Sequence, residues 1–253
     1  MAFSIINDNH IARFTITRPA IRNAINHEVM QGLEQLIELV HNDSTIKFVV
    51  ITGEGTQAFC SGGDLSVFHG LKTAAEAFPM LNQMAQILYK VATLPVPVIA
   101  LVNGAAVGGG CEIATACDYR VVSATAKCGF IQGSLAITSG WGGGTYLLEK
   151  MPQMDQALRM LGDSKPYTAN RLKEIGWATE LYDGDSEVAL QTFIQDMGKI
   201  DASVHRAYKE MVNRKWSSLN LLNQIQEEVI RCSKLWEADA HHIQVQKFLN
   251  RGK

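Results

Sequence analysis

The first part of the chain alternates short apolar runs with segments whose apolar residues recur at helical spacing. Two β-rich runs, Ser4–Asn7 and Ile11–Ile16, are separated by the polar break Asp8–His10, a pattern typical of a hairpin. Apolar residues then recur every three or four positions from Val29 to Val40. This spacing predicts a helix, and Asn26 is placed to cap its first turn.

The middle of the chain repeats a strand followed by a helix. Phe48–Thr52 and Val98–Val102 are continuous apolar runs of the kind found in buried strands. Ala74–Leu94 predicts a helix that ends before two prolines, and a shorter helix to about Cys117 precedes a further strand at Tyr119–Ser123. This alternation predicts right-handed crossovers and a largely parallel sheet in an α/β fold.

From Gly142 onward the pattern becomes almost wholly helical, with no linker or repeat. We expect this part to cover the core or to pack against another subunit, and the basic run Arg251–Lys253 to be a solvated tail. The predicted helices are Met154–Leu161, Ala169–Ile175, Glu187–Met197 and Ser203–Arg214, followed by a loose helical stripe over Leu219–Asn250.

The most informative local feature is a run of three glycines within residues 104–112. A glycine triplet is costly in backbone entropy, so it needs a structural or chemical reason. Here it follows an apolar strand and opens a helix whose first turn contains Glu112. Free N–H groups and the positive end of the helix dipole would face a developing negative charge, beside a possible acid or base. The alternative is close packing of helix and strand without chemistry.

Gly62–Gly63 form a second glycine-rich loop after a separate strand. Two such loops beyond parallel strands can each offer one N–H group to the same oxygen. Two converging donors form an oxyanion hole, which contributes roughly 3 kcal/mol of transition-state stabilisation per donor. The alternative is a mobile surface loop.

Residues 53–58 match the dinucleotide-binding pattern G-x-G-x-x-A, but their context does not fit. That pattern should open a helix directly, whereas Phe59–Asp64 would break one. Glu76 lies near the distance expected of a ribose ligand, although acidic residues are common. A phosphate-binding G-x-x-x-x-G-K-[ST] motif is also missing from the sequence.

Nucleophilic serine chemistry is poorly supported. Ser61 and Ser139 lie in glycine-rich segments, but no histidine occurs between His69 and His205 to serve as a neighbouring base. A third glycine-rich segment contains Trp141. Its indole can close a pocket over an acyl chain or anchor the loop in the core.

Composition narrows the class of protein. The chain has 253 residues, 47% of them hydrophobic, and a formal net charge of −2 without a long charged block. This argues against a protein that binds nucleic acid or a membrane surface. The five cysteines form no C-x-x-C pair and have no histidine cluster at zinc-ligand spacing. We expect reduced, buried thiols, no metal, no transmembrane segment and a cytoplasmic location.

Several segments together resemble the crotonase superfamily, the enoyl-CoA hydratase/isomerase family. Arg18–Ala24 resembles its R-P-x-x-x-N-A element, Ala58–Leu65 its F-x-x-G-x-D loop, and Asn103–Glu112 its N-G-x-x-x-G-G-G-x-E segment, followed by Ala116–Asp118. The resemblance implies a crotonase-like spiral of ββα units with a C-terminal helical region. It implies an acyl-CoA-binding core over residues 1–198, a helical region over 199–253 and a homotrimer or homohexamer.

The resemblance also implies a coenzyme A thioester as substrate, with no further cofactor, and an enolate-like intermediate. The N–H groups of Gly63 and Gly109 would then be the oxyanion donors, and Glu112 the first catalytic glutamate, acting in proton transfer or holding the reacting carboxyl group. The residues expected to border the substrate are Arg22, Asp64, Leu65 and Ser66.

The chain departs from hydratases at their second glutamate, where alignment of Leu135–Gly143 places Gln132. Glutamine cannot exchange a proton near neutral pH, whereas hydration usually shares two proton-transfer tasks between two carboxylates. Gln132, Ser139 and Trp141 would shape the pocket around the α-carbon. The segments that are similar to the ethylmalonyl-CoA and methylmalonyl-CoA decarboxylase branch are Phe59–Leu65, Thr115–Arg120, Trp141–Gly143 and Leu235–Trp236. We therefore favour decarboxylation of a short 2-carboxyacyl-CoA, with hydration of a 2-enoyl-CoA or non-catalytic acyl-CoA binding as alternatives.

Overall fold

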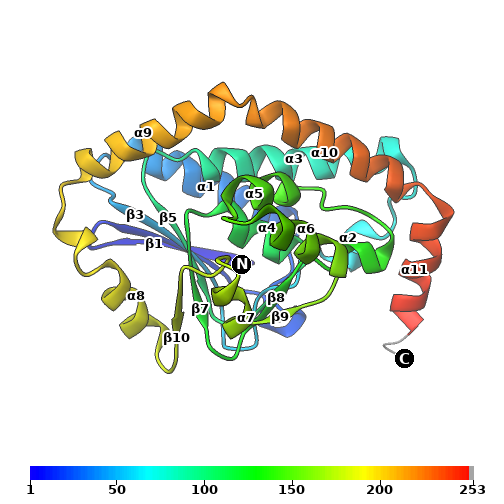
Figure 1. Ribbon diagram of the computed structural model, residues 1–253, viewed down its shortest axis with the longest axis horizontal. Helices are drawn as coiled ribbons and strands as arrows, with labels where there is room; N and C mark the ends of the chain where they lie inside the picture. Colours follow the sequence, from blue (N-terminus) through cyan, green and yellow to red (C-terminus); the bar gives the residue numbers. More distant parts are fainter. Residues whose placement is uncertain (251–253) are drawn as a thin grey trace.

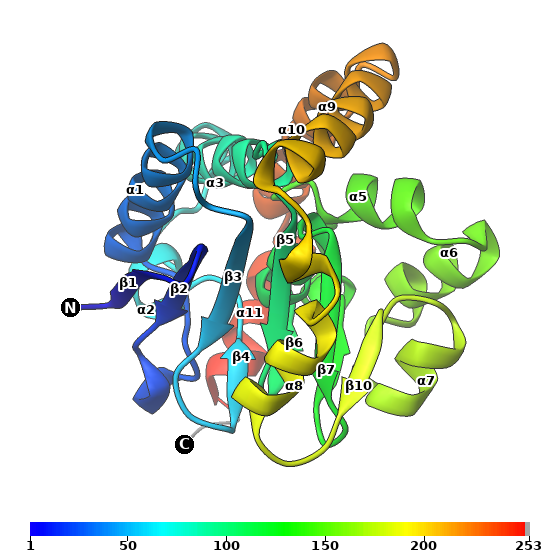
Figure 2. The ribbon, with the colours of Figure 1, turned by 90° about the vertical axis from the view of Figure 1, so that its left-hand side faces the viewer.

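The computed structural model describes residues 1–250, apart from the side chain of Leu249, so the predicted tail Arg251–Lys253 lies outside the described residues. A six-stranded sheet in the order β1-β2-β3-β5-β7-β10 forms the centre of the molecule (Figure 2). Its strands are β1 (Phe3–Asp8), β2 (Ile11–Ile16), β3 (Phe48–Gly53), β5 (Val98–Val102), β7 (Tyr119–Ser123) and β10 (Glu180–Tyr182). The predicted hairpin is confirmed, because β1 and β2 pair antiparallel, while every other pair in this sheet is parallel.

Helices cover both faces of this sheet. On one face lie α1 (His27–Asn42) and α3 (Ala74–Ala92), as predicted, and Asn26 caps α1 by accepting a hydrogen bond from Val29 N at 3.0 Å. On the other face, α8 (Ser186–Ile194) packs against residues that include Phe48 and Val121. Burial on both sides explains why the central strands are continuous apolar runs.

A second, smaller sheet has the order β4-β6-β8-β9. Its strands are β4 (Ala58–Cys60), β6 (Ala105–Val107), β8 (Lys127–Gly129) and β9 (Tyr167–Thr168). Strands of the large and small sheets alternate along the chain, so that β5 and β6 lead into α4 (Gly109–Ala116), and β7 and β8 lead toward α5 (Gly143–Lys150). This repetition is the predicted α/β spiral of ββα units. The sequence pattern missed the small sheet because strands of two or three residues are too short to show a periodicity.

The expectation of an almost wholly helical chain after Gly142 is wrong at two places. β9 and β10 occur there, and β10 joins the edge of the large sheet by pairing in parallel with β7. The remaining short helices are α2 (Leu65–Phe68), α6 (Met154–Asp163), α7 (Ala169–Glu174), η1 (Pro19–Ile21), η2 (Gln132–Leu135) and η3 (Met197–Lys199).

The C-terminal part is helical as predicted, but the stripe over Leu219–Asn250 is not one helix. It divides into α10 (Leu221–Trp236) and α11 (Asp239–Asn250), preceded by α9 (Ala202–Ser218). Figure 1 shows α9 and α10 crossing the top of the molecule over α1 and α3, and α11 turning down at one end. Two hydrogen bonds hold the chain on either side of the turn between α10 and α11. Trp236 donates one to Leu71 O, and His241 donates the other to Leu135 O.

All five cysteines are buried and carry free thiols. No helix within residues 1–250 is long and apolar enough to cross a membrane. The same residues contain no group of three or more His, Cys, Asp or Glu side chains arranged to hold a metal ion.

Candidate active site

Three loops meet at one edge of the small sheet. Strands β4, β6 and β8 run parallel, so their carboxyl ends share an edge. Gly62–Gly63 follow β4, Gly108–Gly109 follow β6, and Gln132 follows β8. In α/β sheets this edge is where ligands bind, because the loops there converge. The structure thus brings together the two glycine loops that the sequence analysis placed in one site.

The N–H groups of Gly63 and Gly109 have no acceptor among the described residues. Gly109 is the first residue of α4, where an N–H group has no partner within the helix. Gly63 lies in a loop beside it, and a Cβ atom on Gly62 would come within 3.1 Å of Gly109 N. Both Gly63 and Gly109 are half-buried, whereas Gly108 and Gly110 are fully buried. Two adjacent donors are therefore available to a ligand oxygen.

The glycine triplet also has packing reasons. Gly108 has φ +56°, a left-handed conformation that favours glycine. A side chain on Gly110 would overlap the carbonyl of Cys60, and one on Gly109 would overlap the ring of Trp141. Close packing and exposed donors are thus not alternatives in this loop, since the same three residues provide both.

A cavity of about 580 Å³ opens above these donors. Gly63, Gly109 and Glu112 lie in its wall, and α11 covers it with residues that include His241 and Val245. Its further lining is mostly apolar and includes Phe68, Met80, Leu81, Ile131, Leu135, Ile137, Cys232, Trp236 and Phe248. The sequence assigned most of these residues no role, although the segment Leu235–Trp236 entered through its similarity to the decarboxylase branch.

Glu112 is buried and its carboxylate accepts four hydrogen bonds. Gln132 Nε2 donates to Oε1 at 2.8 Å, and Gly140 N lies 3.4 Å from the same oxygen. Trp141 N and Gly143 N donate to Oε2 at 2.8 and 2.9 Å. A carboxylate has about four lone-pair directions, so these donors use its capacity. Oε1, with one long contact, is the more weakly held oxygen.

Burial, together with the nearby carboxylate of Glu228, raises the pKa of Glu112 to about 7, against the lowering effect of the backbone donors. Glu228 itself accepts hydrogen bonds from Gly144 N and Thr145 N at 3.1 and 2.8 Å. Two carboxylates therefore share the N-terminal end of α5. A pKa near 7 allows Glu112 to take up and release a proton near neutral pH.

Gln132 and Trp141 line the cavity, as predicted, but Ser139 does not. Ser139 is buried, and its Oγ accepts a hydrogen bond from Gly144 N at 3.0 Å. This hydroxyl therefore helps to cap α5 beside the pocket. Gln132 Nε2 donates a hydrogen bond to Glu112, and Gln132 Oε1 is buried without a partner among the described residues.

The residues predicted to border the substrate near β4 also line the cavity: Arg22, Asp64, Leu65 and Ser66. Asp64 caps α2 by accepting hydrogen bonds from Ser66 N and Oγ, and it forms an ion pair with Arg18 at 2.8 Å. Burial favours a higher pKa, but these hydrogen bonds hold the pKa of Asp64 below its ordinary value. Asp64 is thus a fixed anion that shapes the loop.

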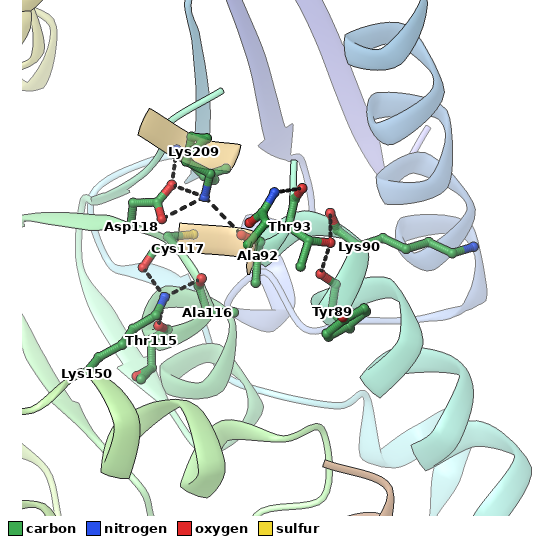
Figure 3. Close-up of polar contacts among 12 residues, drawn as sticks. Tyr89, Lys90, Ala92, Thr93, Thr115, Ala116, Cys117, Asp118, Lys150 and Lys209 are labelled. Carbon is green, nitrogen blue, oxygen red and sulfur yellow. Dashed lines mark hydrogen bonds and ion pairs between the residues drawn. The ribbon is translucent and has the colours of Figure 1, made fainter. Parts of the chain in front are cut away.

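The opposite end of α4 holds a sealed polar cluster (Figure 3). Lys150 Nζ donates to the carbonyls of Thr115, Ala116 and Cys117 at 3.0, 2.7 and 2.9 Å. Beside it, Lys209 Nζ lies 2.8 Å from both carboxylate oxygens of Asp118. Burial lowers the pKa of Lys150 to about 7. This cluster satisfies the last carbonyls of the helix that carries Gly109 and Glu112.

Solved structures share this architecture. The crystal structure of an enoyl-CoA hydratase from Bacillus halodurans superposes with a TM-score of 0.88 at 18% identity, covering 98% of this chain and 100% of that one. An enoyl-CoA hydratase/isomerase from Mycobacterium paratuberculosis gives a TM-score of 0.87 at 22% identity, covering 97% and 98%. At these identities the likeness concerns the fold.

Curated relatives are more similar in sequence. A putative enoyl-CoA hydratase/isomerase of Bacillus subtilis, YngF, is 36% identical over 68% of this chain and 65% of its own length. The short-chain-enoyl-CoA hydratase of Clostridium acetobutylicum is 34% identical over 67% and 64%. The chain therefore covers less than two thirds of either relative. The ethylmalonyl-CoA decarboxylase of Xenopus tropicalis is 29% identical over 81% of this chain and 69% of its own length.

The family model for enoyl-CoA hydratase/isomerase matches residues 7–253, which include both glycine loops, Glu112 and the C-terminal helices. The fold, the paired glycine amides and these matches lead to one conclusion: the chain belongs to the enoyl-CoA hydratase/isomerase family.

Proposed function

We propose that this protein is an acyl-CoA lyase that decarboxylates a short 2-carboxyacyl-CoA through an enolate of the thioester. The thioester oxygen lies between the N–H groups of Gly63 and Gly109. These donors are fixed before the reaction, so they stabilise the charge that develops on that oxygen without reorganisation. The apolar cavity strengthens the interaction because water is excluded.

In the proposed reaction, the bond between the α-carbon and the carboxylate carbon breaks. Its electron pair forms the enolate double bond, the thioester π pair moves to the oxygen, and carbon dioxide leaves. A proton then adds to the α-carbon and restores the thioester. Glu112 is the proposed donor, through Oε1, and it regains the proton from water. The net change is loss of carbon dioxide and uptake of one proton.

The observation that carries this proposal is the environment of Glu112. Its oxygens are held by backbone and Gln132 donors, and Asp64, the other carboxylate lining the described cavity, is paired with Arg18. Activation of water and delivery of a proton to carbon usually need two carboxylates. Decarboxylation needs mainly the oxyanion donors and one proton source, both of which the pocket supplies.

Hydration of a 2-enoyl-CoA is the second candidate. It is favoured by the names of the relatives from B. subtilis and C. acetobutylicum, which are hydratases or putative hydratase/isomerases. In this reaction Glu112 would activate a water molecule, and Gln132 would hold Glu112 in place rather than share the proton transfer.

The products distinguish these proposals. The purified protein is incubated with methylmalonyl-CoA, ethylmalonyl-CoA and crotonyl-CoA, and the mass of each thioester is followed. We expect loss of carbon dioxide from one or both malonyl derivatives. Addition of water to crotonyl-CoA without decarboxylation would support the hydratase instead. Binding of all three compounds without turnover would indicate a non-catalytic acyl-CoA-binding protein.

We also propose a homotrimer or homohexamer in the cytoplasm. Exposed apolar side chains on α6 and α9 support an assembly, among them Met154, Leu158, Tyr208 and Met211. The five buried free thiols fit a reducing compartment. Sedimentation equilibrium of the purified chain tests the assembly, and a concentration-independent monomer would contradict it.

A further inference from the structure

The indole of Trp141 lies directly against both oxyanion glycines. A Cβ atom on Gly109 would overlap its six-membered ring, and one on Gly63 would lie 3.6 Å from its Cζ2 atom. The backbone of the same residue is fixed, because Trp141 N donates to Glu112 Oε2 at 2.8 Å. The ring is therefore held in one place, 5% exposed, in the wall of the cavity.

The indole N–H of Trp141 is an unused donor. Of the other tryptophans, the buried Trp177 and the half-buried Trp236 use theirs: Trp177 Nε1 donates to Thr115 Oγ1, and Trp236 Nε1 donates to Leu71 O, both at 2.9 Å. Trp141 Nε1 has no acceptor among residues 1–250, yet it is not one of the buried polar atoms that are sealed from solvent. It is two covalent bonds from Cζ2, the ring atom nearest Gly63. An accessible donor therefore lies at the edge of the ring that faces Gly63.

We propose that Trp141 is a specificity-determining residue whose indole N–H binds a carboxylate carried on the α-carbon of the acyl-CoA substrate. This inference rests on the proposed function, since it names the group that the site selects. The substrate's α-carbon is bonded to the thioester carbon, so a ligand oxygen at Gly63 and Gly109 brings an α-carboxylate within reach of a donor beside them. A hydrogen bond to an ionised acceptor is stronger than one between neutral groups.

Several other polar groups of the pocket already have partners. Gln132 Nε2 is bound to Glu112, and Ser66 Oγ donates to Asp64 Oδ1 at 2.6 Å. His241 Nδ1 donates to Leu135 O at 2.7 Å. The cationic side chains in the lining, Arg22 and Lys72, are exposed. The rest of the inner wall is largely apolar, so an unpaired carboxylate there would be poorly solvated, and the Trp141 donor offsets that cost.

The test compares two ligands that differ only at the α-carbon. One is propionyl-CoA, and the other is 2-sulfopropionyl-CoA, whose sulfonate keeps an anionic acceptor but cannot be lost as carbon dioxide. Dissociation constants are measured by calorimetry for the wild type and for Trp141→Phe, which removes the N–H group. We expect the variant to bind the sulfonate about tenfold more weakly and propionyl-CoA within about twofold of the wild type. An equal change for both ligands, or no change for either, would overturn the proposal.

Two controls keep the result interpretable. Trp236 lines the same cavity, but its indole N–H is already bound to Leu71 O. Trp236→Phe should therefore change the dissociation constants of both ligands alike. If Trp141→Phe does not fold, 3-benzothienylalanine incorporated at position 141 keeps the bicyclic shape and replaces N–H by sulfur. The same selective loss for the sulfonate is expected. Turnover of methylmalonyl-CoA by the wild type is measured separately, so failure of the decarboxylase proposal is distinguished from failure of this one.

Discussion

Helix α4 (Gly109–Ala116) has one end in the cavity and the other in the sealed cluster of Figure 3. At its C-terminal end, three carbonyls accept from Lys150, and Asp118 is paired with Lys209. At its N-terminal end, Gly109 keeps a free N–H group next to that of Gly63. Both ends bury charge, but among residues 1–250 only the N-terminal end leaves donors without an acceptor. Satisfied polar groups stabilise the fold, and unsatisfied donors at a cavity are available for a ligand.

The largest expected effect is on activity at the N-terminal end. In Glu112→Gln the side-chain amide cannot exchange a proton, and its NH2 group cannot accept from the backbone donors that hold the carboxylate. Turnover should fall by about 10²- to 10⁴-fold. Steady-state kinetics measures this loss, with circular dichroism as the control for folding. Full activity of the variant would show that Glu112 has no role in catalysis.

At the opposite end, the largest effect should be on stability. Lys209→Met leaves the half-buried Asp118 without its cation, and breaking a buried ion pair lowers the free energy of unfolding by about 3–5 kcal/mol. Urea denaturation measures the change. The matched control is Lys199→Met, because the pair of Lys199 with Asp196 is exposed, and it should cost less than about 1 kcal/mol. Similar losses in the two variants would contradict the sealed-cluster interpretation.

Gly109→Ala tests whether the free amide has a fixed position. The new methyl group would overlap the Trp141 ring, so α4 or the indole must move and displace the proposed oxyanion donor. Loss of one such donor lowers kcat by about 10²- to 10³-fold. Gly162→Ala is the control, because nothing lies within 4 Å of a Cβ atom there. If kcat of Gly109→Ala equals that of the control, the Gly109 amide does not stabilise the transition state.

The two ends of α4 should also give opposite pH dependences of stability. The folded-state pKa of Glu112 is raised from 4.5 to about 7, so the native state binds more protons between these values and stability falls as pH rises through them. The folded-state pKa of Lys150 is lowered from 10.5 to about 7, so the unfolded state binds more protons and stability rises from about pH 7 to 10.5. Urea midpoints across pH should lose the first slope in Glu112→Gln and the second in Lys150→Met. Unchanged slopes would contradict these assignments.

The sequence predicted the α/β fold and the strands of the large sheet, but not the small sheet that brings the two glycine loops together. Gly63, Gly109 and Glu112 could be singled out as candidates because glycine loops after strands and an acid in a first helical turn leave a local signal. The large-sheet strands and α1 had similarly clear periodicity. Strands β4, β6 and β8 had none, yet their parallel pairing is what aligns the two loops.

Contacts between distant residues were the part that the sequence could not provide. The Trp141 ring comes into contact with Gly109 only in the folded chain. The sequence alone therefore does not decide whether the ring closes a pocket or anchors a loop. The structure shows that the ring does both. Ser139 has a similar glycine-rich setting, but its hydroxyl turns toward Gly144. The cover formed by α11 also depends on the turn after Trp236, where the helical stripe continues without a strong stop signal.

The central claim is that the N–H groups of Gly63 and Gly109 bind the thioester oxygen. Isotope-edited infrared spectroscopy of butyryl-CoA labelled with ¹³C at the thioester carbonyl measures this contact in the bound ligand. Two donors in an apolar cavity should polarise the carbonyl and lower its stretching frequency below the value in water. Gly109→Ala should reverse part of that shift. A bound thioester whose carbonyl frequency equals that in water would contradict the account.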